Sequence, residues 1–256
     1  MAVMKRPARR TPAMRRRAGG TKAALRSRAV AVEHAIKLPR SLPLRGQLAR
    51  AQSAIIGVDE AGRGPWAGPV VAAAVAVAPG AKDLSWGITD SKLLGEPQRE
   101  CVYERLVASP HVMWSVSVVG HKRIDKINIL EASLEAMAKS VRDLEPKGVR
   151  PSKVLIDGNR LPSQLSDLPC KAVVHGDRQC FVIAAASIIA KVTRDRLMAA
   201  LDRKYPQYGF MAHKGYGTAA HLHALKKHGV TPAHRRTYEP IKGFLESGHW
   251  VSRSSR

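Results

Sequence analysis

The sequence is poor in cysteine and holds no long apolar run, and each shortage excludes a class of protein. Only three of the 256 residues are cysteine, and they form no CxxC pair and no even framework. A disulfide-stapled scaffold is thereby excluded, and a structural zinc site is not indicated. The longest apolar run, Val70–Pro79, ends after about ten residues, whereas a membrane-spanning helix needs roughly 18 to 20. We expect a soluble, reduced protein with no membrane partner.

Acidic residues are also scarce, and this shortage is the most informative one. Against 43 Lys and Arg stand 20 Asp and Glu, which gives a formal net charge of +23. A chain so far from neutrality usually meets a polyanion, and nucleic acid is the first candidate. The excess is uneven, because residues 1–50 hold 14 basic residues and the single acid Glu33.

The composition predicts three regions: a basic, disordered leader or tail over 1–50, one folded domain over 51–246 and a short tail over 247–256. Met1–Arg28 is rich in arginine and alanine, has no acid and shows no regular apolar period. This composition is typical of an organellar transit peptide, which would send the protein to a mitochondrion or another organelle. The alternatives are a basic arm with salt-sensitive affinity for phosphates, or a misassigned start codon, with the protein then in the cytoplasm or nucleoid.

From Ala54 onward the pattern is that of an α/β domain, because short apolar runs punctuated by Gly, Pro and Asp alternate with amphipathic stretches. The predicted strands are Ala54–Val58, Val70–Val77, Val112–Val119, Val154–Ile156 and Ala172–Val174. The predicted helices are Glu96–Val107, Asn128–Leu144 and Cys180–Leu201. A glycine-rich turn joins the first two strands, so an antiparallel pair is expected.

Two adjacent acids, Asp59 and Glu60, follow a buried strand directly and precede a Gly-Arg-Gly-Pro turn in the string IIGVDEAGRGPWAGP. Neighbouring strand side chains point to opposite faces, so both acids reach one site only where the strand ends or bends, as Gly62 and Gly64 permit. A glycine-rich exit beside Arg63 also lets backbone N–H groups approach a phosphate or sugar. The alternative is a surface turn with solvated acids.

Two further acids occupy unusual positions. Asp157 ends the predicted strand VLID, at the edge where α/β sheets gather ligand groups, although an Asp-Gly pair is more often simple turn chemistry. Asp195 lies about 20° from Ile188 around the predicted helix, on its buried stripe. A buried carboxylate must be paired, protonated or metal-bound; the alternative to a ligand role is pairing with Arg194, Arg196 or a distant base.

These four acids, from two strand ends and one helix in a basic chain, suggest a hard-cation site. Carboxylate oxygens together with a substrate phosphate suit Mg²⁺ or Mn²⁺. A zinc site is disfavoured, because there is no suitable cysteine pair and no HxxxH pair flanked by an acid. We therefore expect polar surface or phosphate contacts from the histidines His213, His221, His223, His228 and His234.

Five motifs stand in order along the chain: DEAGRGPWAGPV, DSKLL, IDGN, IAAASIIAKVTRD and KGYGT. Together they resemble the ribonuclease HII family, in order and in spacing, over about Ile55 to Glu246. The segment HGVTPAHRRTYEP resembles the closing motif of that family. Position by position, the catalytic and metal-binding carboxylates of the family fall on Asp59, Glu60, Asp157 and Asp195.

The resemblance implies a ribonuclease H-like α/β fold: a mixed five-stranded central sheet, helices on both faces and a small helical C-terminal extension. It also implies an endoribonuclease that hydrolyses RNA in RNA/DNA hybrids and cuts 5′ to single ribonucleotides in duplex DNA, for ribonucleotide removal, repair and replication. Catalysis by two Mg²⁺ or Mn²⁺ ions would leave 5′-phosphate and 3′-hydroxyl ends.

Substrate choice requires detection of the 2′-hydroxyl, which separates RNA from DNA. The backbone of Gly62, Arg63 and Gly64 matches the family element that holds this hydroxyl and the adjacent phosphate. Tyr216 matches the family tyrosine that contacts the ribose and stacks on the following deoxyribose. Without the family, a tyrosine between glycines is more often a packed turn residue. Expected phosphate contacts, with surface solvation as the alternative, are Lys92, Lys191 and Lys214.

Two other functional classes remain to be weighed. A non-catalytic nucleic-acid-binding protein on the same fold is disfavoured, because a pseudoenzyme is expected to lose at least one of the four acids. A resolvase- or transposase-like enzyme shares the chemistry but has no reason to carry a 2′-hydroxyl detector. We expect a monomer. Residues 242–256 hold no glutamine, aliphatic and paired-aromatic box of the kind that binds a sliding clamp.

Overall fold

The computed structural model describes residues 52–78 and 94–250 of the chain. The predicted leader over 1–50, Lys92 and the last six residues of the predicted tail lie outside these ranges. No helix within them is both long enough and apolar enough to cross a membrane.

The centre of the structure is one mixed five-stranded sheet in the order β3-β2-β1-β4-β5. Its strands are β1 (Gln52–Ala61), β2 (Val70–Val77), β3 (Val112–Val119), β4 (Val149–Asp157) and β5 (Cys170–Val173). The first three pair antiparallel, and β4 and β5 run parallel to β1. This arrangement confirms the ribonuclease H-like sheet that the sequence predicts.

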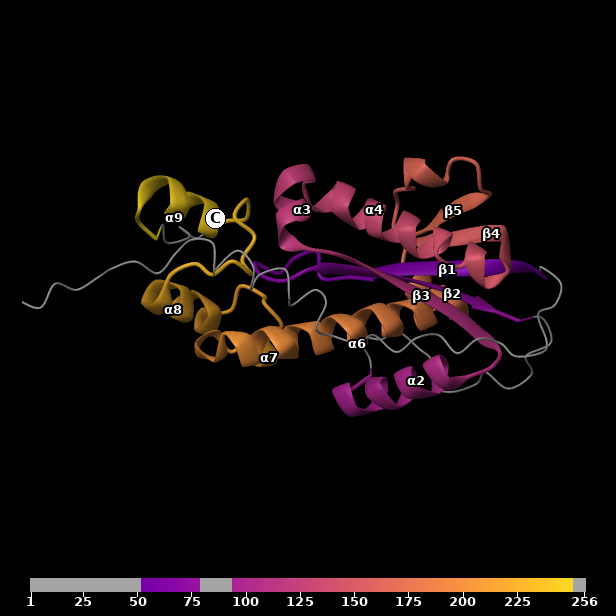
Figure 1. Cartoon of the computed structure of the whole chain (residues 1–256), viewed down its shortest axis with the longest axis horizontal. Coiled ribbons are helices and arrows are strands. Elements are labelled where there is room, and N and C mark those ends of the chain that lie inside the picture. Colours follow the sequence, from indigo (N-terminus) through magenta and orange to yellow (C-terminus); the bar gives the residue numbers. More distant parts are fainter. Residues whose placement is uncertain (1–51, 79–93, 251–256) are drawn as a thin grey trace, which may run out of the picture.

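Helices cover both faces of the sheet, α4 on one side and α6 with α2 on the other (Figure 1). The helices are α2 (Glu96–Ala108), α3 (His121–Ile127), α4 (Ile129–Arg142), α5 (Gly176–Gln179), α6 (Phe181–Lys204), α7 (Phe210–His213), α8 (Ala219–His228) and α9 (Ile241–Ser247). Short 3₁₀ turns are η1 (Glu145–Lys147), η2 (Ser163–Leu165) and η3 (Pro206–Tyr208). The core therefore has three layers.

The uninterrupted apolar sequence of β2, VVAAAVAV, follows from burial on both sides. Ala72 and Ala74 pack in the cluster that includes α4, whereas Ala73 and Val75 pack in the cluster that includes α6. Since neither face of the strand meets water, polar and apolar residues do not alternate. The alanines let both helices approach the sheet closely.

A single glycine fixes how near α6 lies to β1. A Cβ built on Gly57 would fall 2.2 Å from the backbone carbon of Val182, in the first turn of α6. No side chain fits there, so the helix touches the strand backbone directly. This contact brings the polar residues further along α6 over the carboxyl end of β1.

Several element boundaries differ from those that the sequence predicts, most of all in β4. β4 begins at Val149 rather than Val154, because it pairs with β1 from Gln52 and tolerates Pro151 at a register shift beside Ala54. The predicted helix over Asn128–Leu144 is confirmed as α4 (Ile129–Arg142), whereas the short helix before it, α3 (His121–Ile127), was not predicted. Asn128, with φ 67°, separates α3 from α4 and accepts a hydrogen bond from the Glu131 amide.

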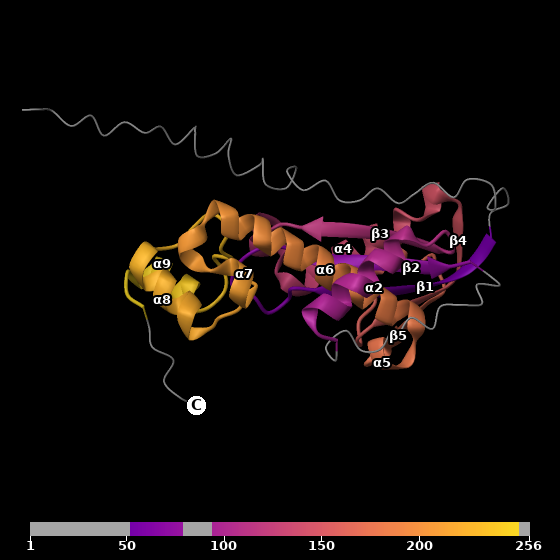
Figure 2. The same cartoon turned by 90° about the horizontal axis from the view of Figure 1, so that it is seen from below.

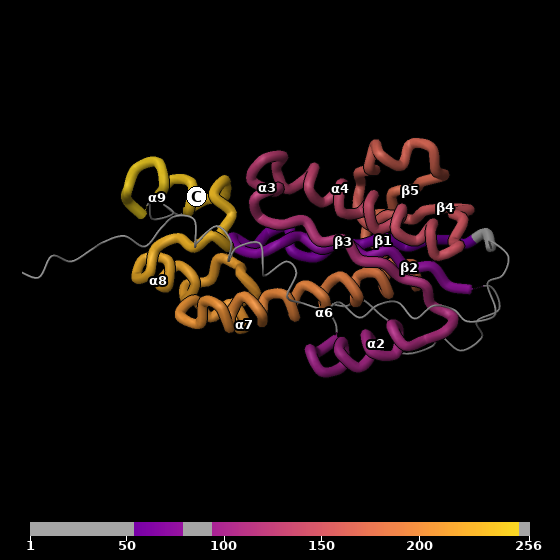
Figure 3. Tube along the Cα trace, in the orientation of Figure 1, coloured from indigo at the N-terminus to yellow at the C-terminus, as the bar shows by residue number. Residues whose placement is uncertain are grey.

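The C-terminal helices form the expected small extension at one end of α6 (Figure 2). They enclose their own apolar cluster, which includes Met198 of α6 and Phe210, Leu225 and Ile241. Between α8 and α9 the chain returns to the turn that joins β1 and β2 (Figure 3), where Ala67 forms an isolated bridge with His234. The extension is thus built against that turn.

Candidate active site

The carboxyl end of β1, the turn after it and one face of α6 enclose a pocket of about 370 Å³. Its lining residues are Asp59, Glu60, Ala61, Gly62, Arg63, Gly64, Arg99, Asp157, Ser187, Lys191, Arg194 and Tyr216. Most of the site residues that the sequence predicts therefore meet in one place. A larger, mostly apolar hollow of about 620 Å³ lies beside β3, α4 and α6, and none of the predicted site residues lines it.

Asp59 is the buried centre of the pocket, with 6% of its surface exposed. Burial raises the pKa of its carboxyl well above the usual value, and the charges of Glu60 and Asp157 raise it further. A hydrogen bond from Ser187 and one from the Glu60 amide, at 2.7 Å, oppose this rise. Asp59 therefore carries its negative charge at a cost.

Glu60 lies beside it and is closer to solvent. Burial raises the pKa of the Glu60 carboxyl, and Arg63 lowers it through an ion pair of 3.4 Å. Asp157 ends β4 next to β1, with Oδ1 accepting the Gly176 amide proton at 2.7 Å. Parallel pairing of Val58 with Ile156 places the two strand ends side by side.

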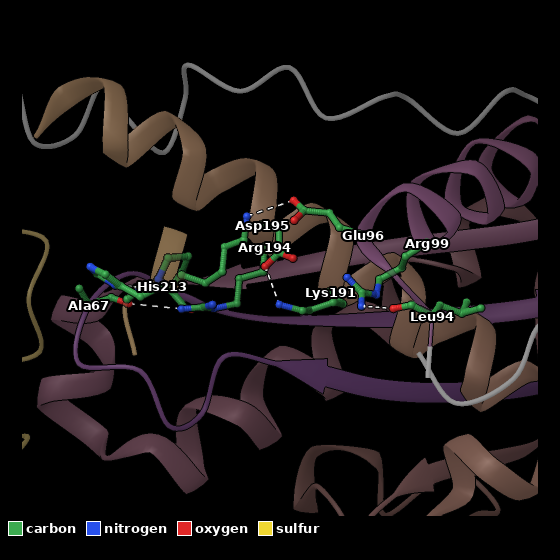
Figure 4. Close-up of polar contacts among 11 residues, drawn as sticks. Ala67, Leu94, Glu96, Arg99, Lys191, Arg194, Asp195 and His213 are labelled. Carbon is green, nitrogen blue, oxygen red and sulfur yellow. Dashed lines mark hydrogen bonds and ion pairs between the residues drawn. The ribbon is translucent and has the colours of Figure 1, made fainter. Parts of the chain in front are cut away.

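Asp195 is buried on α6, as its helical position predicts, but it does not line the pocket. Its Oδ1 accepts a hydrogen bond of 2.7 Å from Lys191 Nζ, one helical turn away (Figure 4). The two arginines considered from the sequence have other partners: Arg194 donates to backbone carbonyls, and Arg196 pairs with Glu100 and Glu104. Lys191 thus joins the pocket to the fourth carboxylate.

The donor set fits a divalent cation in its chemistry. Three carboxylates supply hard oxygen ligands, and a cation would relieve the repulsion that raises the pKa of Asp59. Within 52–78 and 94–250, however, no three carboxylate, imidazole or thiol groups converge closely enough to hold one ion. Carboxylates can share the coordination of Mg²⁺ with water and substrate phosphate.

Two buried arginines fix the Gly62–Gly64 turn. Gly62 has φ 97°, and a Cβ there would fall 2.0 Å from Arg194 Nε, so glycine is required. Arg235, fully buried, donates to the carbonyls of Gly62 at 2.6 Å and Arg63 at 2.8 Å. The turn carbonyls therefore point into the protein and are held there.

The sequence alone missed four residues of the site: Ser187, Arg194, Arg99 and Arg235. The first two had a readable signal, because Ser187, Lys191, Arg194 and Asp195 stand at i, i+4, i+7 and i+8 of an apolar helix. That spacing is one polar stripe. Arg99 lines the pocket from α2 and donates to Leu94 O at 2.7 Å (Figure 4).

The expected surface role of the histidines is wrong for His221 and His234, which are 0% and 1% exposed. They pack in the C-terminal extension against Phe210, at ring distances of 5.5 and 5.6 Å. Lys214 does not line the pocket, and its Nζ lies 3.2 Å from Oε1 of Glu96, which is labelled in Figure 4.

Comparison with known proteins identifies close relatives. The family model described as Ribonuclease HII matches residues 56–240. The ribonuclease HII of Chlamydia muridarum is 50% identical over 196 residues, 77% of this chain and 87% of that protein. That of Neisseria meningitidis serogroup A is 49% identical over 189 residues, 74% of this chain and 94% of that protein.

Solved structures give the same result. Ribonuclease H2 from Pyrococcus horikoshii matches with a TM-score of 0.61 and 29% identity, over 75% of this chain and 97% of that one. The ribonuclease HII of Archaeoglobus fulgidus, solved as a complex with PCNA, matches with a TM-score of 0.62 and 27% identity, over 73% and 95%.

Proposed function

Because the chain belongs to the ribonuclease HII family and is thus a ribonuclease H, we propose that its pocket cuts duplex DNA on the 5′ side of single embedded ribonucleotides. Enzymes of this kind hydrolyse the RNA strand of RNA/DNA hybrids. The products proposed here are 5′-phosphate and 3′-hydroxyl ends, and the proposed cellular role is ribonucleotide removal during repair and replication.

One observation carries the proposal. The same pocket holds the carboxylates of Asp59, Glu60 and Asp157, the glycine-rich turn and the Tyr216 ring. A phosphodiester that reaches the carboxylates would therefore lie against both the turn and the ring. Recognition of the sugar and hydrolysis of its phosphate can occur on one bound nucleotide.

We propose that Asp59, Glu60, Asp157 and Asp195 hold Mg²⁺ or Mn²⁺ together with substrate oxygens. Bound there, a pair of such ions would activate the attacking water and stabilise the leaving 3′ oxygen. Lys191 binds Oδ1 of the Asp195 carboxylate, so an ion would either bind Oδ2 or displace the lysine from Oδ1. Lys191 is close enough to the pocket to pair with a substrate phosphate instead. A related ribonuclease HIII structure was solved with Mn²⁺.

The remaining residues would bind and orient the substrate. The Gly62–Gly64 turn would receive the 2′-hydroxyl and the neighbouring phosphate, since glycine lets the backbone approach a sugar. Arg63, which is exposed, and Lys214 would add phosphate contacts. The Tyr216 side chain, 47% exposed, would stack on the sugar of the following deoxynucleotide. All these residues come from one chain, so a monomer suffices.

The test uses three end-labelled duplexes: all-DNA, DNA with one ribonucleotide, and an RNA/DNA hybrid. Each is incubated with Mg²⁺, Mn²⁺ or chelator, and the Asp157→Asn variant is the matched control. A metal-dependent cut 5′ to the single ribonucleotide, with all-DNA intact, is expected. Cleavage of the hybrid alone would overturn the proposed cut at single ribonucleotides, whereas the ribonuclease H activity would stand.

A further inference from the structure

Two buried histidines form a hydrogen-bond chain with only one consistent direction. The Thr231 amide, which can only donate, lies 3.0 Å from His234 Nδ1. A neutral His234 then carries its proton on Nε2, which lies 3.0 Å from His221 Nε2. His221 must accept there and carry its own proton on Nδ1, 2.9 Å from the Tyr216 carbonyl oxygen. The carbonyl can only accept, so both ends of the chain agree.

This hydrogen-bond chain requires both imidazoles to be neutral, and their surroundings keep them neutral. Burial and the charges of neighbouring histidines together lower the pKa of His221 to about 4 and that of His234 to about 3. His213 stacks on His221 at 4.5 Å, and His121 adds to the repulsion on His234. The hydroxyl of Thr231 also contacts His234 Nδ1, at 2.8 Å.

The hydrogen-bond chain from Thr231 through the two histidines ends on the loop that carries Tyr216. Gly215 and Gly217 fit this loop against the segment Trp66–Ala67: a Cβ on Gly215 would meet Ala67 O at 2.7 Å, and one on Gly217 would meet the Trp66 ring at 2.1 Å. The Tyr216 carbonyl accepts from the Thr218 amide as well as from His221. The backbone around Tyr216 is thus held by packing against Trp66–Ala67 and by hydrogen bonds from Thr218 and His221, while the Tyr216 ring stays exposed.

Arg235, the next residue after His234, holds the other half of the recognition pocket. Its guanidinium donates to the carbonyls of Gly62, Arg63 and Gly68 at 2.6, 2.8 and 3.0 Å. Consecutive residues of one C-terminal segment therefore fix both the glycine-rich turn and the tyrosine loop.

We propose that His234 and Arg235 are positioning residues that set the spacing between the Gly62–Gly64 turn and Tyr216. His221 links His234 to the tyrosine through its two ring hydrogen bonds. Neither histidine touches substrate. The inference rests on the proposed function, because the spacing they fix is the one that would distinguish a single ribonucleotide from a continuous hybrid.

Three variants separate positioning from packing. His221→Phe keeps an aromatic ring against Phe210 and His213 but removes both hydrogen bonds. His221→Asn retains a side-chain N–H near the position of Nδ1, so it can still donate to the Tyr216 carbonyl. His111→Phe is the matched control, because His111 is exposed and lines neither pocket.

kcat and KM are measured on the single-ribonucleotide duplex and on the long hybrid, with the melting temperature of each variant. We expect His221→Phe to lower kcat/KM about tenfold on the single ribonucleotide, and far less on the hybrid, since small misplacements of a recognition group cost large factors in rate. His221→Asn should recover most of the loss, and His111→Phe should match wild type. Equal losses on both substrates, or none, would overturn the proposal.

A second measurement is independent of activity. In ¹⁵N spectra of histidine-labelled protein at neutral pH, His234 should be protonated at Nε2 and His221 at Nδ1. Any other pair of tautomers, or a charged imidazole, would overturn the link through His221 even in a fully active enzyme. If instead wild type fails to cut single ribonucleotides while the tautomers are as expected, the proposed function fails and the link through His221 stands.

Discussion

The ring of Tyr216 lies over Gly64, so that a Cβ on the glycine would sit 3.4 Å from Tyr216 Cε1. The two residues are 152 positions apart in the printed sequence, and both line the pocket. Under the proposed function, a ribose bound in the pocket would contact both the glycine backbone and the tyrosine ring. We therefore expect the relative placement of the two residues to affect substrate discrimination.

Tyr216→Ala should reduce cleavage at single ribonucleotides about tenfold or more, because base and sugar stacking on an aromatic ring is worth about 1–3 kcal/mol. Cleavage of long hybrids should fall less, since each position there presents a 2′-hydroxyl. The ring is 47% exposed, so the melting temperature should change little. Tyr216→Phe, which keeps the ring, is the control; equal losses on both substrates would contradict the junction role.

Asp157→Asn should retain duplex binding and lower kcat by about a hundredfold or more, the scale at which lost electrostatic stabilisation affects a transition state. Its Oδ1 can still accept the Gly176 amide proton at 2.7 Å, so the local fold should persist. Binding is measured by fluorescence anisotropy in chelator, and cleavage by single-turnover kinetics. Robust cleavage by the variant would remove Asp157 from the metal site.

Asp59→Asn should stabilise the protein in chelator at neutral pH. The unfolded chain titrates Asp59 near the ordinary 3.8, whereas burial raises the folded pKa well above this value. The folded carboxylate is thus destabilising at neutral pH. The penalty begins to shrink as the pH falls through the folded pKa and is gone below the unfolded value of 3.8. The difference in melting temperature between variant and wild type should shrink on acidification.

Divalent metal provides the complementary measurement for the same variant. Mg²⁺ or Mn²⁺ should raise the melting temperature of wild type more than that of Asp59→Asn, because ligand binding to the folded state stabilises it. An equal rise in both proteins would show that the ion binds elsewhere.

Gly57→Ala should destabilise the fold by about 1–3 kcal/mol, the usual cost of overpacking a core. The new Cβ would lie 2.2 Å from backbone carbon of Val182, which cannot move without shifting α6. Urea denaturation measures the change as a lower midpoint at constant slope. Gly64→Ala is the matched control, because its Cβ has ordinary space; similar losses in the two variants would refute the close-packing argument.

Patterns that repeat along the chain made the sheet and the long helices predictable. The boundaries of β2 and β3 are those expected from their apolar runs, because strands buried on two faces leave a continuous signal. Pro151 and the charged residues around it concealed the first half of β4, which only its pairing with β1 reveals. The seven residues of α3 were missed, because so short a helix has too few turns to show an apolar period.

The pocket was predictable where neighbours in sequence are neighbours in space. Asp59, Glu60 and the turn after them could be placed together from one string of letters. The partner of Asp195 was not predictable, because one turn of α6 presents both lysine and arginine and packing selects between them. No periodicity in the sequence predicts the contact between His221 and His234, because that contact depends on how the C-terminal extension folds back.

That fold-back has a consequence for synthesis. Every carboxylate of the site precedes residue 196, yet the carbonyls of Gly62 and Arg63 are held by Arg235, about forty residues later. A nascent chain stopped in α8 already contains the acids but lacks the donor that shapes the substrate turn. The ribosome thus completes the four carboxylates before the arginine that holds the Gly62–Gly64 turn, so we expect a product truncated in α8 to lack substrate selection.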